Sequence, residues 1–558
     1  MKSSSSYVGY KETRESSRAF FATTLIIAVA IILATANENA FGQGDRSPNR
    51  QGVGARVGAA LRGETNPANQ ANARRAQPQT PQPQPQTTAP QGNAPNAGAA
   101  PRRESCVLAS GRKVGAADVV EISLEASGQI LQTNSEGAQE RAPMEVAAGF
   151  KYEERCEQFS PNGAIRTIRR YEQAGMKRKF GSSVARPLLD SSRKFVVSEF
   201  DGRKTRVYSL GGPLKDEQYA LLNELPFNTT CLDKLLPNRE VRVGDDWSAP
   251  DEVVAALLGV DAIENNTLRM ALTSCDDSFA VVEIFQIGKK TAEGEQPSTM
   301  TCAAEGASID LDLEGKFQFD VAAKRITWFG IKISERRSQS VAAPGLDWSA
   351  TLKISVAPLE APEKLTDDVV APFKEKPTDE LLKLYYNAQK GPWKFQHSRK
   401  WKLIEDGDKV AALCFLDAGE AVAQCNILSN GKIDLSTKPS LNGYKNEIRN
   451  GLGERFAEFK QDAEYEGPGN SSVYYVAADG LYEDAPYRWI YYLITDKDGN
   501  QATIMFELRA DLLDKYDDSG NEIVESFRIV PRSTQGLREA LQKDGQATEN
   551  QGVPSASK

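Results

Sequence analysis

The one histidine and the seven cysteines are the side chains of this 558-residue chain that are best suited to nucleophilic or redox chemistry. His397 lies in a basic and aromatic stretch, and no Gly-x-Ser-x-Gly motif elsewhere supplies a nucleophile for it. A catalytic histidine needs such a partner within hydrogen-bond reach. We therefore interpret His397 as a partly exposed structural residue. A single histidine also excludes metal sites built from several histidines.

The spacing of the cysteines favours disulfides over metal or redox sites. No two of them form a Cys-x-x-Cys pair, which argues against zinc ribbons and thioredoxin-type sites. We expect Cys414 and Cys425 to face each other across a hairpin with a four-residue loop, as a disulfide or a close contact. Cys275 and Cys302 are a weaker candidate pair across a β-meander. Because seven is odd, at least one thiol is free or joins another chain.

Acidic residues form the other cluster that could carry out chemistry. Asp310, Asp312 and Glu314 alternate with apolar residues, so we interpret them as the solvent face of a half-buried strand. A cation site or a carboxylate pair is the alternative. The phosphate-binding patterns Gly-x-x-x-x-Gly-Lys-Ser/Thr and Gly-x-Gly-x-x-Gly are both missing. We therefore assign no catalytic, metal-binding or cofactor-binding residue, and we expect no cofactor.

The N-terminal residues predict export. Basic residues precede an uncharged apolar stretch at 19–36, as in a secretory signal, and small residues near 36 and 42 offer cleavage sites. The alternative is a retained anchor, since about 18 apolar residues are close to the minimum for a membrane span. Residues 1–43 are thus a signal peptide or a membrane anchor. Either way we expect the rest to be extracytoplasmic, in the periplasm or secreted, and possibly tethered to the inner membrane by residues 19–36.

Residues 44–104 are rich in Pro, Gln, Asn and Ala and predict a disordered linker. This arm carries eight arginines against three acids, which leaves a net charge of −14 on residues 105–558. A basic arm on an acidic body could contact anionic polymers or lipid head groups, although a plain spacer has the same composition. The acidic balance opposes nucleic acid as a partner.

Two folded units follow the arm, and the fold class is α+β. Period-2 alternation dominates 105–358, where we expect an antiparallel β-rich domain that curls around one or two helices as a half-barrel. A linker at 359–376 leads to an α/β sandwich domain at 377–531, and a disordered tail at 532–558 ends the chain. In the sandwich, the apolar spacing predicts helices over 378–390, 441–460 and 521–529.

Short motifs suggest a family resemblance for each unit. Val-Gly-Asp-Asp-Trp at 243–247 and Arg-Ile-Thr-Trp at 325–328 resemble uncharacterised secreted β-proteins of planctomycete-type bacteria. The second unit resembles the Mog1/PsbP-like sandwich through Trp401, Ala-Gln-Cys at 423–425 and Trp-Ile-Tyr-Tyr at 489–492. These resemblances imply folds and no established chemistry, so they assign no functional residue.

Three functions fit these features. The leading hypothesis is a non-enzymatic extracytoplasmic protein that binds or scaffolds a protein or cell-envelope partner, because the chain has a display arm and lacks a catalytic set. The second is a carrier of a lipid or another apolar ligand, which requires an apolar cavity of several hundred Å³ in the first unit. The third is a histidine-independent carboxylate hydrolase, which requires two acids in a cleft with shifted pKa values.

Overall fold

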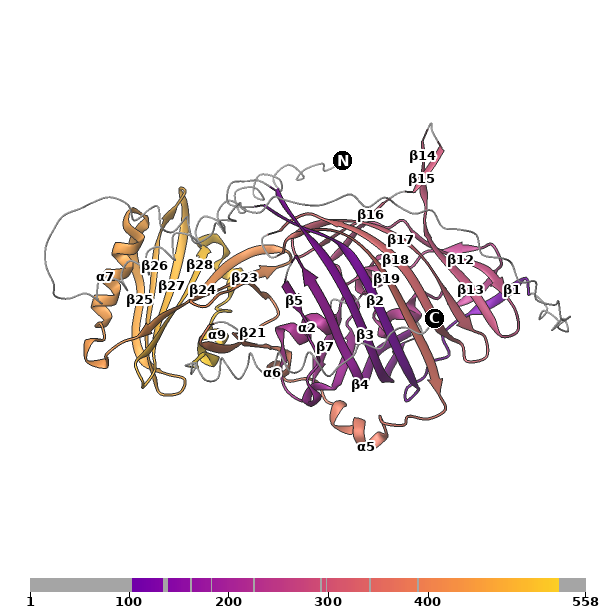
Figure 1. Cartoon of the computed structure of the whole chain (residues 1–558), viewed down its shortest axis with the longest axis horizontal. Coiled ribbons are helices and arrows are strands. Elements are labelled where there is room, and N and C mark those ends of the chain that lie inside the picture. The colour runs from indigo at the N-terminus through magenta and orange to yellow at the C-terminus, as the bar shows by residue number, and fades with distance from the viewer. Residues whose placement is uncertain are drawn as a thin grey trace, which may run out of the picture. The chain divides into compact units, whose positions relative to one another are not determined.

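The computed structural model describes residues 103–133, 139–160, 163–181, 183–223, 226–291, 294–297, 299–340, 343–388 and 391–530 (Figure 1). The predicted signal or anchor, nearly all of the arm and the predicted tail lie outside the described residues. No helix within the described ranges is long and apolar enough to cross a membrane.

Long antiparallel strands build one open sheet of 14 strands, which forms most of the first unit (Figure 1). Its main path runs β10-β12-β13-β17-β18-β19-β2-β3-β4-β6-β7, and β5, β11 and β16 pair at its margins. The strands are β2 (Ala117–Thr133), β3 (Gln139–Ser160), β4 (Gly163–Phe180), β5 (Ser183–Ala185), β6 (Phe195–Phe200), β7 (Thr205–Ser209), β10 (Asp246–Trp247), β11 (Ala262–Asn265), β12 (Leu268–Cys275), β13 (Phe279–Gln286), β16 (Met300–Ala304), β17 (Ala307–Asp320), β18 (Arg325–Arg337) and β19 (Gly345–Leu359).

Alternating polarity decides which face of this sheet is buried. Along β17 the apolar residues are buried and the polar residues between them are exposed, as the sequence predicts. Three short helices pack on the buried face, namely α2 (Asp216–Asn223), α3 (Thr229–Leu232) and α4 (Asp251–Leu258). Leu221, Leu232 and Leu257 on these helices belong to the same hydrophobic cluster as the inward residues of the sheet. The predicted combination of an open antiparallel sheet with a few helices is therefore confirmed.

Two small two-stranded sheets accompany the large one. Strand β1 (Ser105–Leu108) pairs with β9 (Arg239–Arg242), and β14 (Gly288–Thr291) pairs with β15 (Gly294–Pro297). The first pair matters for packing, because Cys106 and Leu108 on β1 point into the main core while Val107 between them is exposed.

The second unit is a seven-stranded antiparallel sheet with helices on both faces. Its order is β22-β23-β24-β28-β27-β26-β25. Helix α7 (Leu441–Leu452) packs on one face through Tyr444, Ile448 and Leu452. Helices α8 (Leu513–Tyr516) and α9 (Asn521–Ser526) pack on the other. The strands are β22 (Trp401–Asp406), β23 (Val410–Asp417), β24 (Glu420–Lys432), β25 (Phe456–Gly467), β26 (Ser471–Tyr482), β27 (Ala485–Thr495) and β28 (Asn500–Arg509).

The helices predicted for the second unit are shorter than expected. Within the described residues 378–388, the one helix is α6 (Asp379–Leu382), and it is followed by strand β20 (Leu384–Asn387). Helix α7 ends at Leu452, and strand β25 takes the rest of 441–460. Pairing with neighbouring strands supplies these segments with backbone hydrogen bonds that local helical periodicity cannot foresee.

The segment predicted as a linker, 359–376, is packed against the first sheet. It contains α5 (Asp367–Val370) and a 3₁₀ turn η3 (Ala371–Phe373). Leu365, Val370 and Phe373 form a separate small core with Ile168 and Tyr208. The buried Glu153 carboxylate also accepts hydrogen bonds from the backbone N–H groups of residues 363–365 at 2.9–3.1 Å. Pro-, Glu- and Lys-rich composition alone did not reveal this anchoring.

A four-stranded sheet, β29-β21-β20-β8, joins residues that precede and follow that segment. Strand β8 (Leu214–Lys215) lies before it, whereas β20, β21 (Trp393–His397) and β29 (Arg528–Ile529) follow it. Strand β8 pairs with β20 in parallel, and the other two pairings are antiparallel.

Candidate functional site

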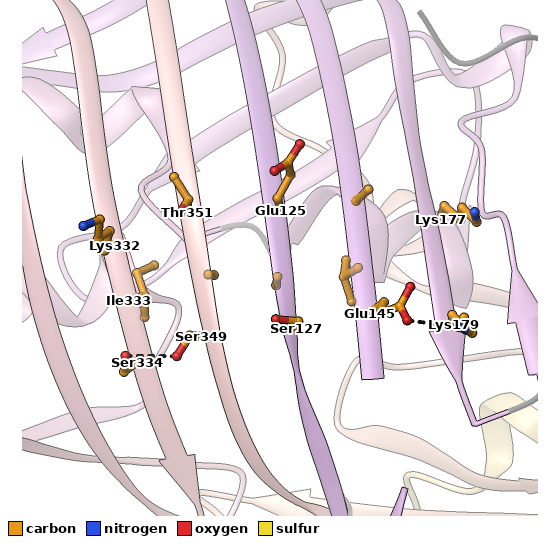
Figure 2. A pocket seen from close by; sticks show the side chains of 14 residues that line it. Glu125, Ser127, Glu145, Lys177, Lys179, Lys332, Ile333, Ser334, Ser349 and Thr351 are labelled. Atoms are coloured by element: carbon orange, nitrogen blue, oxygen red, sulfur yellow. Dashed lines mark hydrogen bonds and ion pairs between the residues drawn. The ribbon is translucent and has the colours of Figure 1, made fainter. Parts of the chain in front are cut away.

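A polar trough of about 670 Å³ lies on the exposed face of the large sheet (Figure 2). Residues opposite each other on neighbouring strands share a face, so the register of β18, β19, β2, β3 and β4 places the lining side chains in two rows. One row is Lys332, Thr351, Glu125, Ala147 and Lys177. The other row is Ser334, Ser349, Ser127, Glu145 and Lys179.

Small side chains make the floor of the trough and lysines stand at its ends. Ser127 and Ser349 lie in the middle, and the Ser334 and Ser349 hydroxyls are hydrogen-bonded at 3.1 Å. Figure 2 shows Lys332 at one end and Lys177 at the other. Four inter-strand spacings separate these two lysines, which is about 19 Å. The trough is thus open and rich in hydroxyl groups, with lysines at both ends and the Glu125 and Glu145 carboxylates between them.

Only part of the charge in the trough is neutralised by ion pairs. The Lys179 ammonium group donates to the Glu145 carboxylate at 2.9 Å. Among the described residues, neither Lys177 nor Lys332 has a carboxylate within ion-pair distance. A side chain with an unpaired charge and a nearby hydroxyl floor can bind an anionic group without first breaking an internal contact.

The acidic residues singled out from the sequence lie just beyond this trough. Glu314 is opposite Lys332, and Asp312 is opposite Ser334, on strand β17. Asp310, Asp312 and Glu314 are all exposed, as expected for the wet face of a half-buried strand. They do not converge in a cleft, so these three residues do not support the hypothesis of a carboxylate hydrolase.

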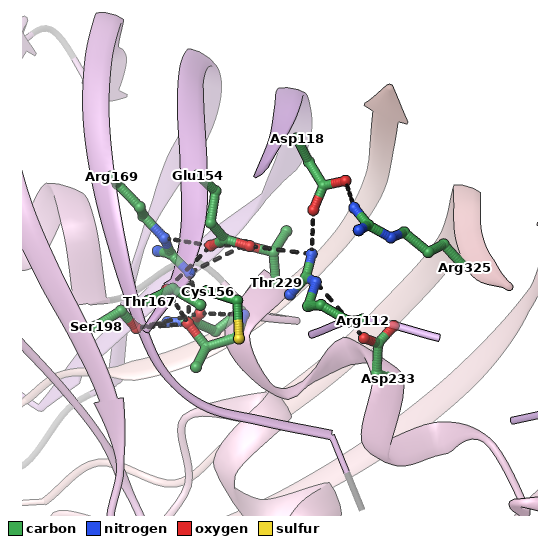
Figure 3. A network of polar contacts seen from close by, with 12 residues as sticks. Arg112, Asp118, Glu154, Cys156, Thr167, Arg169, Ser198, Thr229, Asp233 and Arg325 are labelled. Atoms are coloured by element: carbon green, nitrogen blue, oxygen red, sulfur yellow. Dashed lines mark hydrogen bonds and ion pairs between the residues drawn. The ribbon is translucent and has the colours of Figure 1, made fainter. Parts of the chain in front are cut away.

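A second cluster, on the buried side of the same sheet, is a network of six charged side chains (Figure 3). Arg112 donates to Asp118 at 2.7 Å and lies 3.4 Å from Glu154 and 3.8 Å from Asp233. Arg169 donates to Glu154 at 2.8 Å, and Arg325 pairs with Asp118. Three arginines therefore balance three carboxylates within the core.

Neighbouring charges favour the ionised form of Glu154. Burial raises the pKa of Glu154, but the Arg169 and Arg112 guanidinium groups outweigh burial and lower it below the ordinary value. The Thr229 hydroxyl at the start of α3 also donates to Glu154, at 2.7 Å. The network thus ties α3 to the sheet, and its balanced, buried charges indicate a structural role. Its members lie between residues 112 and 325 of the sequence, so no short sequence motif could have predicted the network.

His397 is fully buried, with 0% of its surface exposed, and this corrects the prediction of a partly exposed residue. Its Nε2 lies 3.2 Å from the Asp216 carboxylate at the start of α2, and its Nδ1 lies 2.9 Å from the Ser398 carbonyl oxygen. Burial lowers the pKa of His397, but Asp216 and the Ser398 carbonyl outweigh it and raise the pKa above its ordinary value. The ring packs against Phe395 and the Asp216 carboxylate, and the pairing of its strand β21 with β20 was not predicted from the sequence.

The strand register does not bring the cysteine pairs predicted from the sequence opposite each other, and the structure contains no disulfide between any of the seven cysteines. The β23–β24 hairpin has a two-residue loop, Ala418 and Gly419, both with positive φ, and a bulge beside Phe415. Cys414 is therefore opposite Gln424 rather than Cys425. A shift of one residue places the two thiols on opposite faces of the sheet.

The second predicted pair, Cys275 and Cys302, lies on strands that are not neighbours. Strand β12 pairs with β10 and β13, whereas β16 pairs with β11 and β17. Both thiols point into the core of the first unit. The meander order therefore does not bring them opposite each other.

The second unit contains a buried carboxyl group that sequence reasoning missed. Glu507 on β28 is 1% exposed, opposite the buried amide side chain of Gln424 on β24. Burial raises the pKa of Glu507 to about 8, against the smaller opposing effects of Arg455 and of the Trp489 indole. Its position in an apolar strand, between Phe506 and Leu508, was the available signal.

No family model matches the chain, and no curated protein matches it. Among solved structures, lipovitellin is similar at 8% identity and a TM-score of 0.26, over 45% of this chain and 26% of lipovitellin. The chain thus spans about a quarter of the length of lipovitellin.

Two smaller proteins are matched over 99% of their own length. The cyanobacterial PsbP of Synechocystis sp. PCC 6803 has 15% identity and a TM-score of 0.21 over 28% of this chain. PA94, a protein of unknown function and putative regulator from Pseudomonas aeruginosa, has 11% identity and a TM-score of 0.19 over 27% of this chain. Likenesses at these scores carry no argument about function.

Proposed function

We propose that this protein is an extracytoplasmic, non-enzymatic binding or scaffolding protein, and that the trough on strands β18, β19, β2, β3 and β4 binds a polar, anionic polymer. The observation that carries the proposal is the pair of unpaired lysines, Lys332 and Lys177, at the two ends of a hydroxyl-rich floor. An extended ligand with repeated negative charges would reach both lysines at once. Export, inferred from residues 1–43, would expose the trough to acidic polysaccharides of the cell envelope.

Two further features support binding of a polar ligand over transport of an apolar one. Buried side chains of α2–α4 pack in one hydrophobic cluster with the inward residues of the strands. The second well-formed depression, of about 520 Å³, is lined by Ser248, Asp251, Glu252, Asn266 and Arg269 among others, and is also polar. An apolar ligand would gain little from either depression, because binding of lipid requires apolar surface to be buried.

We also propose that the second unit is a Mog1/PsbP-like sandwich. The support is its seven-stranded antiparallel sheet, with α7 on one face and α8 and α9 on the other. In such an arrangement the unit would extend the scaffold, since α5 and Glu153 fasten the connecting segment to the first sheet. That the first unit is related to secreted planctomycete-type β-proteins also stays a proposal, supported by the motifs at 243–247 and 325–328.

The experiment is a calorimetric titration of the full chain with polygalacturonate, an acidic polysaccharide. Neutral dextran of similar length is the control polymer. We expect binding to polygalacturonate that weakens with added salt, and at least tenfold weaker binding by the double variant K177E/K332E. The matched control is K497E, which reverses the charge of an exposed lysine in a turn of the second unit. Equal affinity of the two variants, or no binding of the acidic polymer, would contradict the proposal.

A further inference from the structure

Strand β1, where the described chain begins, is held to the end of strand β12 by several contacts. The Arg103 backbone N–H donates to the Cys275 carbonyl oxygen at 2.9 Å, and the Arg103 guanidinium pairs with Asp277. The Glu104 carbonyl accepts from the Val243 N–H at 2.8 Å, just beyond strand β9. Residues that are far apart in the sequence thus meet at one point of the first unit.

Two cysteine side chains lie together at this point. Cys106 is 4% exposed on β1 and Cys275 is 2% exposed at the end of β12, and both belong to the main hydrophobic cluster. The Cys106 thiol interacts with the Cys275 thiol and contributes to raising its pKa, and the two thiols also donate to the backbone carbonyls of Val107 and Asp276 at 3.9 and 3.6 Å. No other pair of thiols in contact is found among the described residues. Cys231, for comparison, contacts the Thr205 hydroxyl, and Cys156 contacts the Gln158 carbonyl.

We propose that Cys106 and Cys275 are joined by a disulfide bond in the mature protein, which fastens strand β1 to the end of strand β12. A disulfide requires the two Cα atoms to lie about 4.4–6.8 Å apart. The hydrogen bond between the Arg103 N–H and the Cys275 carbonyl oxygen brings the start of β1 against the end of β12, where such a separation can be reached. The bond would close a loop of 169 residues, and a cross-link over a long loop restricts the unfolded chain strongly. The proposal does not depend on the ligand of the trough.

The oxidation is a balanced exchange with an external disulfide. One thiolate attacks the oxidant, for example oxidised glutathione, and forms a mixed disulfide with release of one glutathione thiol. The second thiolate then displaces the remaining glutathione, so that the protein loses two electrons and two protons and the oxidant becomes two thiols. The reaction therefore needs only a thiol–disulfide oxidant of the kind found in oxidising compartments.

The burial of the pair determines when the bond can form. Burial, with a smaller contribution from the Cys106 thiol, raises the pKa of Cys275 to about 12. Because the thiolate is the reactive form, the folded and reduced pair reacts slowly. We therefore expect the bond to form while the chain folds, and to resist both oxidants and reductants once packing is complete.

The test uses the full chain, reduced in denaturant and refolded in a glutathione redox buffer. Remaining thiols are blocked with N-ethylmaleimide in denaturant, and the protein is digested with trypsin without reduction. The expected product is peptide 104–112 linked to peptide 270–289, each of which contains one cysteine. Recovery of both peptides with the maleimide attached, or a link from either one to another cysteine, would overturn the proposal. Neither result depends on whether the trough binds a polymer, so the two proposals fail separately.

Thermal unfolding of variants gives a second test of the proposed disulfide. We expect reductant to lower the Tm of the wild-type chain by about 5–15 °C, once the reductant has acted on unfolded protein. C106S and C275S should both lack this response. C302S is the matched control, because Cys302 is an equally buried thiol of the same core, and it should keep the response. A wild-type Tm that is independent of reductant would contradict the proposal.

Discussion

Replacement of Glu507 by glutamine should stabilise the protein by an amount that grows with pH. In the folded state the pKa of this carboxyl group is raised from 4.5 to about 8, chiefly by burial. Between these two values the folded chain keeps a proton that the unfolded chain has lost, so stability falls as the pH rises. Glutamine has nearly the same shape and never ionises, so the variant E507Q does not share this loss.

The magnitude follows from the same pKa values. A difference of one pKa unit corresponds to ~1.4 kcal/mol. The full displacement of Glu507 therefore costs on the order of 5 kcal/mol above pH 8, about 3 kcal/mol at pH 7, and almost nothing at pH 4, where both states are protonated. Because the side chain is 1% exposed, solvent screening does not reduce this figure appreciably.

The assay is guanidinium unfolding of the full chain at pH 5, 7 and 9, with wild type and E507Q compared at each pH. The matched control is E466Q, which removes an exposed carboxylate from strand β25 of the same sheet and should change the free energy of unfolding by less than about 0.5 kcal/mol. An E507Q gain of equal size at pH 5 and pH 9 would refute the reasoning. So would a loss of stability at pH 9, since it would mean that an ionised Glu507 is held by Arg455.

Three further outcomes follow from the buried charges and rings. The raised pKa of His397 stabilises the β21–β20 pairing below its unfolded value of 6.5, and this stabilisation is lost as the pH rises through the folded value. The amide protection factors of Leu384–Asn387, which are corrected for base-catalysed intrinsic exchange, should therefore fall at alkaline pH in wild type and stay constant in H397N. Arg112→Met should leave Asp118, Glu154 and Asp233 short of one counter-charge and destabilise the first unit by about 3–5 kcal/mol in denaturant unfolding. The neighbouring Lys113 is exposed, so Lys113→Met should change the free energy of unfolding very little in the same assay. Trp401→Ala should cost about 3–5 kcal/mol, because the indole is buried against Phe415, Phe506 and Tyr516, and a decrease below 1 kcal/mol in the same measurement would contradict this packing.

Local pattern predicted much of the first unit because its strands are half-buried. Alternation in 309–320 marks the buried and exposed faces directly, and the strand there extends from Ala307 to Asp320. The same reasoning failed in 441–460, where apolar residues at helical spacing continue beyond the helix. Phe456 and Phe459 belong to strand β25 and still pack against the core that α7 covers. Periodicity therefore identified the buried positions there but not the type of element.

The candidate sites depended on the register of strands, which the sequence left open. The trough takes two rows of side chains from five strands. The lysines at its two ends, Lys177 and Lys332, lie on strands that are far apart in the sequence. The cysteines illustrate the same limit, since one bulged residue in the β23–β24 hairpin separates Cys414 from Cys425. Cys106 and Cys275 meet only because β1 packs at the end of β12, 169 positions along the chain.

The sequence by itself thus determined the export prediction, the order of a β-rich unit and a mixed unit, and the alternation that buries one face of the long strands. These features depend on composition and on neighbours a few residues away, where hydrophobic burial and backbone geometry act locally. The tertiary structure alone decided the pairing of strands, the burial of His397, Glu507 and the Arg112 network, and the contact of two thiols. Those depend on long-range packing, because the free energy of a buried charge or thiol is set by the groups that the fold brings against it.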